Sequence, residues 1–178
     1  YDGIVQKEVF TLPSYTTAGG KTIRNVRIGY ETYDRLNAAR DNVVVISHFF
    51  TGTSHAAGKY SPDDKAPGYW DAIIGAGRAI DTDRFFVICS NVLGGCMGST
   101  GPASRKPDGT YWGTDFPVIT IADMVRAQAA LLDHLGIQQA VLVGCSRAGQ
   151  IVIETTIEFP GRVRGVVSVC GGLSGFDY

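Results

Sequence analysis

Residues 140–149 read AVLVGCSRAG, an apolar run that passes through small residues into a more polar segment. Ala140–Val143 is short and rich in β-branched residues, which is typical of a strand buried on both faces. The following residues, 147–159, have helical character and stop before Pro160, so a helix is expected there. Ser146 lies at the junction. A serine on a tight strand-to-helix turn projects its hydroxyl above the sheet, which makes Ser146 a candidate nucleophile.

The neighbours of Ser146 suit that chemistry. Gly144 keeps the tight turn free of a side chain. A helix N-terminus offers free backbone N–H groups and the positive end of the dipole, so the Arg147 N–H is expected to stabilise an oxyanion. Ala148 stands where a second glycine is usual. The alternative is that Ser146 only caps the helix, because serine is a preferred N-cap residue.

Three more short β-branched runs extend the sheet outward from this turn. They are Val43–His48, Phe85–Ser90 and Val163–Cys170, and together they predict a mostly parallel sheet. Before them, Val5–Leu12 and Thr22–Tyr30 have the mixed pattern of half-exposed strands, and Gly19-Gly20 between them suits a hairpin turn.

Helices are expected between the buried strands. Apolar residues recur at helical spacing between Ile121 and Leu135, with a capping box at Thr120 and Asp123 and a stop at Gly136. A shorter helix is expected near Tyr69–Ala79. Strands alternating with helices on both faces of a mostly parallel sheet, with a serine elbow, predict an α/β-hydrolase fold in a single domain over residues 1–178.

A second oxyanion donor in this fold comes from the loop after an earlier strand. Here that loop is residues 47–52, Gly52 allows it to turn, and Phe50 is the preferred source of the N–H. His48 and His55 are interpreted as packed residues that shape this region. His134 lies near a helix C-terminus, where the dipole accounts for a histidine without a catalytic role.

Charge balance, hydrophobic runs and cysteine spacing exclude several classes of function. The 178 residues carry 16 basic and 17 acidic side chains, so no charge bias favours nucleic acid or an anionic membrane. No apolar run is long enough to span a membrane. The four cysteines form no C-x-x-C pair, and three lie in apolar strand-like runs (Cys89, Cys145 and Cys170), which predicts buried reduced thiols, no metal site and a cytoplasmic protein. The long irregular stretch Asn91–Pro117 is interpreted as a binding loop rather than a simple surface excursion.

Several motifs resemble homoserine O-acetyltransferase and its relatives, in the N-terminal part of that family. They are Gly29–Tyr33, His48–Gly52, Pro67–Asp71, Ile80–Phe86, Leu93–Cys96, Gly98–Pro102, Phe116-Pro117 and Thr120–Val125. The resemblance implies a ping-pong mechanism in which a serine takes an acetyl group from acetyl-CoA, as substrate rather than cofactor, and passes it to a hydroxyl acceptor.

Two departures from the family concern the acyl pocket. The usual loop reads His-Ala-Leu-Thr-Gly where this chain has HFFTG at residues 48–52. The usual elbow reads Gly-x-Ser-Met-Gly-Gly where this chain has GCSRAG at residues 144–149. Homoserine, another alcohol and water therefore all stay open as acceptors, and water would make the protein a carboxylesterase or thioesterase.

The base and the acid of a triad are expected on loops after later strands of this fold. The chain stops just after the strand that follows the nucleophile helix, and Asp177 comes too early for the usual acid. We therefore expect the chain to be a fragment, a cleaved product, or one chain of a two-chain enzyme. A homodimer is also an open alternative for its oligomeric state. The rival from another class is a non-catalytic remnant or binding module.

Overall fold

The computed structural model describes residues 1–172. Its elements follow the chain as β1 (Glu8–Thr16), β2 (Thr22–Tyr33), β3 (Val43–Ser47), β4 (Ile74–Gly75), β5 (Ile80–Asp81), β6 (Phe86–Ser90), α1 (Ile121–His134), β7 (Ala140–Cys145), α2 (Arg147–Glu158) and β8 (Val163–Val169). Two short 3-10 turns, Gly113–Asp115 and Pro160–Arg162, lie before α1 and before β8. No helix in residues 1–172 is long and apolar enough to cross a membrane.

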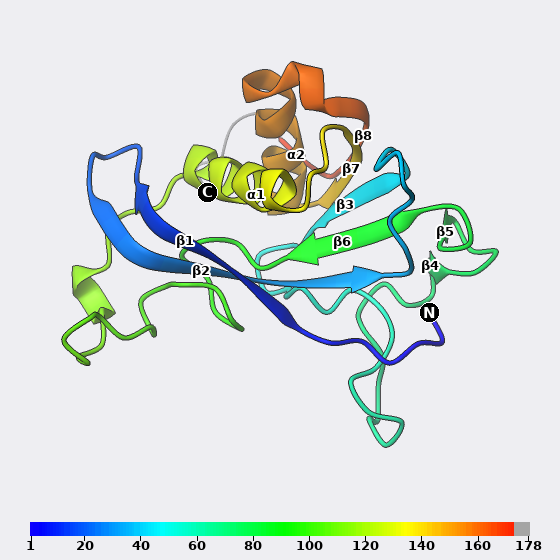
Figure 1. Cartoon of the computed structure of the whole chain (residues 1–178), viewed down its shortest axis with the longest axis horizontal. Coiled ribbons are helices and arrows are strands. Elements are labelled where there is room, and N and C mark those ends of the chain that lie inside the picture. Colours follow the sequence, from blue (N-terminus) through cyan, green and yellow to red (C-terminus); the bar gives the residue numbers. More distant parts are fainter. Residues whose placement is uncertain (173–178) are drawn as a thin grey trace.

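Six strands form one mixed sheet in the order β1-β2-β6-β3-β7-β8 (Figure 1). Strands β6, β3, β7 and β8 are parallel neighbours, whereas β2 joins β6 and β1 in antiparallel pairs. The two first strands form the expected hairpin, which turns near Gly20 at a φ of 78°. Every residue of β3 and of β6 is buried, as their uninterrupted apolar character predicts.

The capping box of α1 also forms hydrogen bonds to the β1–β2 hairpin. The Thr120 hydroxyl accepts a hydrogen bond from the Asp123 N–H at 3.2 Å, and the buried Asp123 carboxylate accepts one from the Thr120 N–H at 2.9 Å. The same carboxylate accepts hydrogen bonds from the Tyr15 hydroxyl at 2.9 Å and the Ala18 N–H at 2.8 Å. Burial alone would raise the pKa of Asp123, but these donors hold it below the ordinary value. The predicted cap is confirmed, and the link to the hairpin is an addition that the local motif does not reveal.

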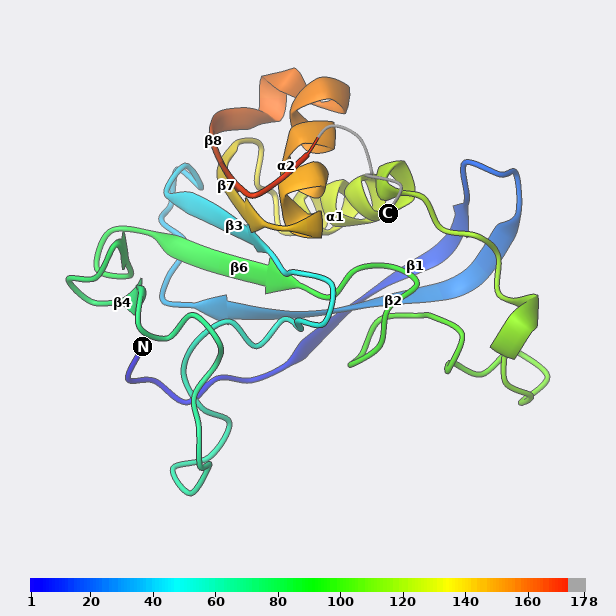
Figure 2. The ribbon, with the colours of Figure 1, turned by 180° about the vertical axis from the view of Figure 1, so that it is seen from behind.

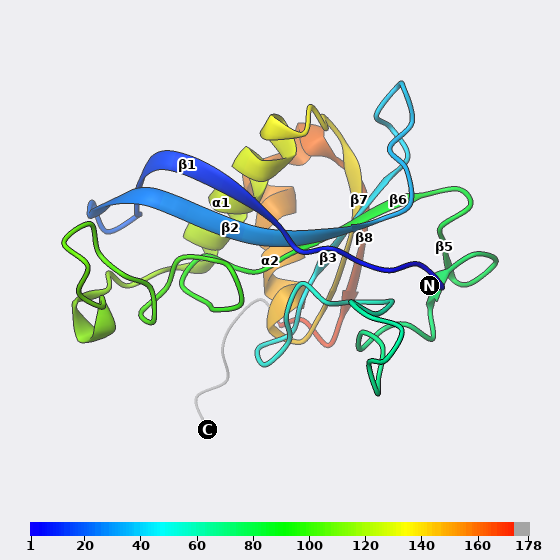
Figure 3. The ribbon, with the colours of Figure 1, turned by 60° about the horizontal axis from the view of Figure 1, so that its bottom comes forward.

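Both α-helices cover one face of the sheet, as the views from the front, from behind and from below show (Figures 1, 2 and 3). The core on this side joins residues of α1 and α2 to the sheet, including Leu131, Val152 and Val45. The opposite face is covered by the segment between β3 and β6, which contributes Tyr69, Trp70 and Ile74 to a second apolar cluster.

The helix expected near Tyr69–Ala79 is wrong. The chain instead makes turns and the short parallel pair β4–β5. Gly75 and Gly77 adopt φ values of 152° and 67°, which lie far from the helical region. Turns pack the partly buried Tyr69 and Trp70 against the sheet, because apolar burial does not require a regular backbone.

Strand β8 pairs with β7 on one side, and no strand of residues 1–172 pairs with its other side. Val167 and Val169 on this strand expose 48% and 46% of their surface, although the sequence predicts a buried strand. The expectation of buried cysteines holds for Cys89 alone, since Cys145 is half-buried and Cys170 is exposed.

Candidate active site

Ser146 occupies a strained turn between β7 and α2. Its φ and ψ are 60° and −127°, a region that non-glycine residues avoid at a cost of about 1–3 kcal/mol. The Ser146 N–H donates to the Val169 carbonyl at 2.9 Å, so the end of β8 helps to hold the turn. The side chain is exposed and makes no capping hydrogen bond to α2. Capping therefore does not explain this serine.

The turn depends on close backbone contacts at two glycines. A Cβ on Gly144 would lie 2.3 Å from the Ala148 carbonyl oxygen, and one on Gly149 would lie 2.5 Å from the Gly171 Cα. Ala148 is fully buried, so its methyl group is accommodated where the usual motif has glycine.

Gly144→Ala should lower the unfolding free energy of the complete protein by about 1–3 kcal/mol, because the added methyl group collides with rigid backbone. Urea denaturation would measure the change. The matched control is Gly161→Ala, since a Cβ on Gly161 meets nothing within 4 Å. Equal effects of the two substitutions would contradict the close contact.

The loop after β3 presents Phe50 toward the same turn. His48 is buried, its Nδ1 bonds the Phe49 carbonyl at 2.8 Å, and its Nε2 accepts a hydrogen bond from the Val92 N–H at 3.3 Å. Burial lowers the pKa of His48, which favours the neutral ring that this pairing requires. Phe50 is 74% exposed, and the Arg147 guanidinium lies 5.1 Å from the centre of its ring. His48 thus shapes the loop, as the sequence suggests.

Phe50 and Arg147, the two residues expected to supply oxyanion donors, line the same pocket. Among the hydrogen bonds of residues 1–172, none uses the backbone N–H of Phe50 or of Arg147 as a donor. Both residues line a cavity of about 460 Å³, although Ser146 itself is not among the lining residues. Most of the remaining wall belongs to the stretch Asn91–Pro117. The stretch Asn91–Pro117 thus forms a pocket wall, which is where a binding loop is expected to lie.

A buried carboxylate that the sequence does not single out supports these loops. Glu31 on β2 is fully buried and accepts hydrogen bonds from the Ser54 hydroxyl at 2.7 Å and the Tyr60 hydroxyl at 2.8 Å. It also bonds His55 Nδ1 at 2.9 Å, and the Lys7 ammonium lies 3.5 Å away. The position could have been noticed only as an acidic residue inside an otherwise buried stretch of strand.

Asn91 extends this network to the pocket wall. Its side chain accepts a hydrogen bond from the Ser54 N–H at 2.8 Å and donates to the Met97 carbonyl at 2.8 Å. The loop after β3 is therefore tied to the loop after β6. Phe50 and the stretch after Asn91 both line the same pocket, so the network connects the two loops that form it.

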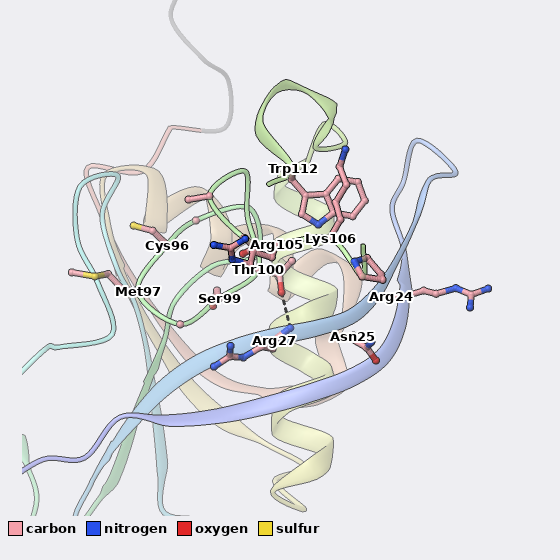
Figure 4. Close-up of a pocket in the computed structure, with 15 residues that line it drawn as sticks. Arg24, Asn25, Arg27, Cys96, Met97, Ser99, Thr100, Arg105, Lys106 and Trp112 are labelled. Atoms are coloured by element: carbon pink, nitrogen blue, oxygen red, sulfur yellow. Dashed lines mark hydrogen bonds between the residues drawn. The ribbon is translucent and has the colours of Figure 1, made fainter. Parts of the chain in front are cut away.

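A second pocket of about 570 Å³ lies between the hairpin and the same long stretch (Figure 4). Three of its four lining cations are engaged or directed elsewhere, and Arg27 is the fourth. Arg105 donates to the Gly109 carbonyl at 2.6 Å, Lys106 pairs with Asp115 at 2.6 Å, and Arg24 points away from the other side chains. This pocket therefore presents less free charge than its composition suggests.

None of the three histidines is placed to serve Ser146. His48 has both ring nitrogens bonded, His55 bonds Glu31, and His134 stacks on Phe10 at 4.8 Å. Asp177 lies outside the described residues. Within residues 1–172, no three histidine, cysteine or acidic side chains converge as a metal site would require.

The chain is similar in sequence and structure to homoserine acyltransferases and to an esterase. Over 170 residues the chain is 51% identical to a homoserine O-acetyltransferase of Geobacter sulfurreducens, covering 94% of this chain and 46% of that one. A homoserine O-succinyltransferase of Stutzerimonas stutzeri is 50% identical over 171 residues, with coverages of 94% and 45%. The crystal structure of esterase E22 superposes with a TM-score of 0.86 at 49% identity, covering 90% of this chain and 46% of that one.

The chain thus spans less than half the length of these relatives. The resemblance that the motifs suggest is confirmed across almost the whole chain. A family model described as the alpha/beta hydrolase fold matches residues 42–177, a range that begins just before β3 and includes the elbow, α2 and β8. The chain therefore belongs to the α/β-hydrolase fold family.

Proposed function

We propose that the complete protein transfers acyl groups through an acyl-enzyme on Ser146. One observation carries the proposal: Ser146 holds a strained backbone conformation at the start of a 12-residue helix without using its hydroxyl to cap that helix. Strain of this kind persists where the surrounding structure maintains it, and it is concentrated at functional sites. The relatedness to homoserine acyltransferases supports the same chemistry.

In the first half-reaction the Ser146 oxygen bonds the carbonyl carbon of the donor thioester and the carbon–sulfur bond breaks. The serine proton passes through a general base to the departing thiolate. In the second, the acceptor hydroxyl attacks the acyl-serine ester, and its proton returns to the serine oxygen. The N–H groups of Phe50 and Arg147 are the proposed donors to the oxyanion of each tetrahedral intermediate. The base and its acid partner come from outside residues 1–172.

An ester hydrolase is the second candidate, and a specific observation favours it. Esterase E22 is about as similar in sequence to this chain as the homoserine acyltransferases are. The serine chemistry would be the same, with water in place of the alcohol in the second half-reaction.

The acceptor decides between these candidates. The complete gene product is supplied with acetyl-CoA, with and without homoserine, and both free thiol and acetate are measured. Thiol release that requires homoserine, with acetyl transfer to it, supports the acyltransferase. Acetate release at the same rate without homoserine supports the hydrolase. Absence of any reaction, together with absence of labelling by a serine-reactive fluorophosphonate, would contradict both and favour the non-catalytic rival.

A further inference from the structure

The second pocket, between the hairpin and the stretch Asn91–Pro117, is lined by four cations and by no acidic residue. The cations are Arg24 and Arg27 on β2, and Arg105 and Lys106 on the long stretch. The whole chain carries 16 basic and 17 acidic side chains, so this lining departs locally from a balanced charge. Because a cleft lined by charges of one sign focuses their field, the pocket attracts an anion.

Hydrogen bonding within the chain leaves most of this positive charge in place. Of the four cations, only Lys106 pairs with an acid within residues 1–172, and this partner is Asp115 at 2.6 Å. Arg105 donates to two neutral oxygens, the Gly109 carbonyl at 2.6 Å and the Tyr111 hydroxyl at 3.2 Å. These bonds orient the Arg105 guanidinium without neutralising it. The pocket therefore keeps three positive charges that no acid of the described chain neutralises.

Arg27 is the cation of this pocket that is best placed to contact a ligand. Within residues 1–172 its hydrogen bonds involve only its backbone, so the guanidinium keeps its donors. Outside the hairpin pairing, the Arg27 N–H donates to the hydroxyl of the buried Thr100 at 2.8 Å, and the Arg27 carbonyl accepts from the Thr100 N–H at 2.8 Å. Figure 4 shows Arg27 on the strand side of the pocket and Arg105 on the loop side, whereas Arg24 points away. The backbone of Arg27 is thus anchored, and its charged end remains available.

The loop wall of the pocket adds backbone donors. Three consecutive lining residues, Cys96, Met97 and Gly98, have N–H groups that donate no hydrogen bond within residues 1–172. Met97 and Gly98 have φ values of 57° and 106°, and successive N–H groups in turns with left-handed residues form concave anion sites. The hydroxyl of the buried Ser99 donates to the Asn91 carbonyl at 2.8 Å, which fixes this segment to the end of β6. Both walls therefore offer donors before a ligand binds.

We propose that the second pocket is a phosphate-binding site in which the Arg27 guanidinium contacts the phosphate directly. Guanidinium and phosphate groups form paired, charge-assisted hydrogen bonds, which give both affinity and orientation. A phosphate group carries close to two negative charges and three acceptor oxygens, which suits several donors on two walls better than a single carboxylate would. The site is independent of the proposed acyl-enzyme chemistry and can be tested without turnover.

The phosphate can come from two sources. Gly95 and Cys96 line both pockets, so the two cavities adjoin along this segment. The phosphate therefore belongs either to the far end of an acyl donor whose acyl end enters the first pocket, or to a separate small molecule. The cavity of about 570 Å³ also has room for more than a phosphate, and Trp112 provides an aromatic surface in its lining.

The first test measures binding alone. Inorganic pyrophosphate is titrated calorimetrically into the complete protein at constant ionic strength. Arg27→Gln should weaken binding about 10- to 100-fold, as expected for loss of hydrogen bonds between charged groups, and Arg27→Lys should keep part of the affinity. Arg24→Gln is the matched control, because it removes the same charge from the same strand but Arg24 points away from the other side chains, and binding should weaken less than about threefold. Absence of pyrophosphate binding, or equal effects of Arg27→Gln and Arg24→Gln, overturns the inference.

The second test separates the two sources of the phosphate. KM is measured for acetyl-CoA and for S-acetylpantetheine, a thioester without phosphate. If the phosphate belongs to the acyl donor, Arg27→Gln raises KM for acetyl-CoA about 10-fold or more and leaves KM for S-acetylpantetheine unchanged. If it belongs to a separate molecule, both KM values stay unchanged while pyrophosphate binding is lost. Equal rises in both KM values overturn the assignment of Arg27 to a phosphate. Absence of turnover with either thioester would contradict the proposed function alone, because the pyrophosphate titration does not depend on it.

Discussion

Replacing Ser146 with alanine should reduce acyl transfer by the complete protein at least about 1,000-fold, because loss of a nucleophilic serine leaves only binding and oxyanion stabilisation. The turnover of 4-nitrophenyl acetate measures the loss. Labelling by a fluorophosphonate probe should disappear in parallel, since this reagent forms a bond to the activated serine oxygen. Labelling that persists in Ser146→Ala would mean that another residue is the nucleophile.

Ser146→Gly is the matched control for the strained turn. It should be as inactive as the alanine variant, yet its unfolding free energy should be about 1 kcal/mol higher than that of Ser146→Ala. Glycine tolerates the φ of 60°, whereas alanine retains the strain, and the greater flexibility of glycine in the unfolded chain offsets part of the gain. A glycine variant less stable than the alanine variant would contradict strain at this position.

Glu31→Ala should destabilise the protein by about 3–5 kcal/mol, because it breaks a buried ionic and hydrogen-bonded network. Glu31 is fully buried, and the side chains of Ser54, Tyr60 and His55 would lose their shared acceptor. Urea denaturation of the complete protein measures the change. Activity should also fall at urea concentrations that leave the protein folded, because the loop carrying Phe50 would no longer be held against the loop after β6.

Two comparisons sharpen the Glu31 prediction. Glu31→Gln preserves the shape and one acceptor oxygen, so its effect should be smaller than that of alanine. Asp115→Ala breaks an ion pair with Lys106 in which the carboxylate is 69% exposed, and it should leave the unfolding transition unchanged. If Glu31→Ala is as mild as Asp115→Ala, the network does not stabilise the loops.

The sequence by itself determined the features that depend on near neighbours in the chain. The capping box of Thr120 and Asp123, the hairpin turn at Gly20 and the junction of strand and helix at Ser146 were all predictable. Backbone preferences and hydrophobic periodicity act within a few residues, so their patterns are visible without a structure. The free N–H groups at a helix start follow from the same local geometry.

Only the tertiary structure decided which distant segments meet. Turns rather than a helix cover the second face of the sheet, because Gly75 and Gly77 allow the segment to follow the surface while its aromatic residues pack against the sheet. Glu31 joins loops that lie far apart in the sequence, and Asp123 reaches the hairpin more than a hundred residues earlier. No local pattern encodes such contacts, since each depends on how the whole sheet is assembled. Ser146 was therefore identifiable as a candidate from ten residues, whereas the pocket lined by Phe50 and Arg147 forms only when separate loops are brought together.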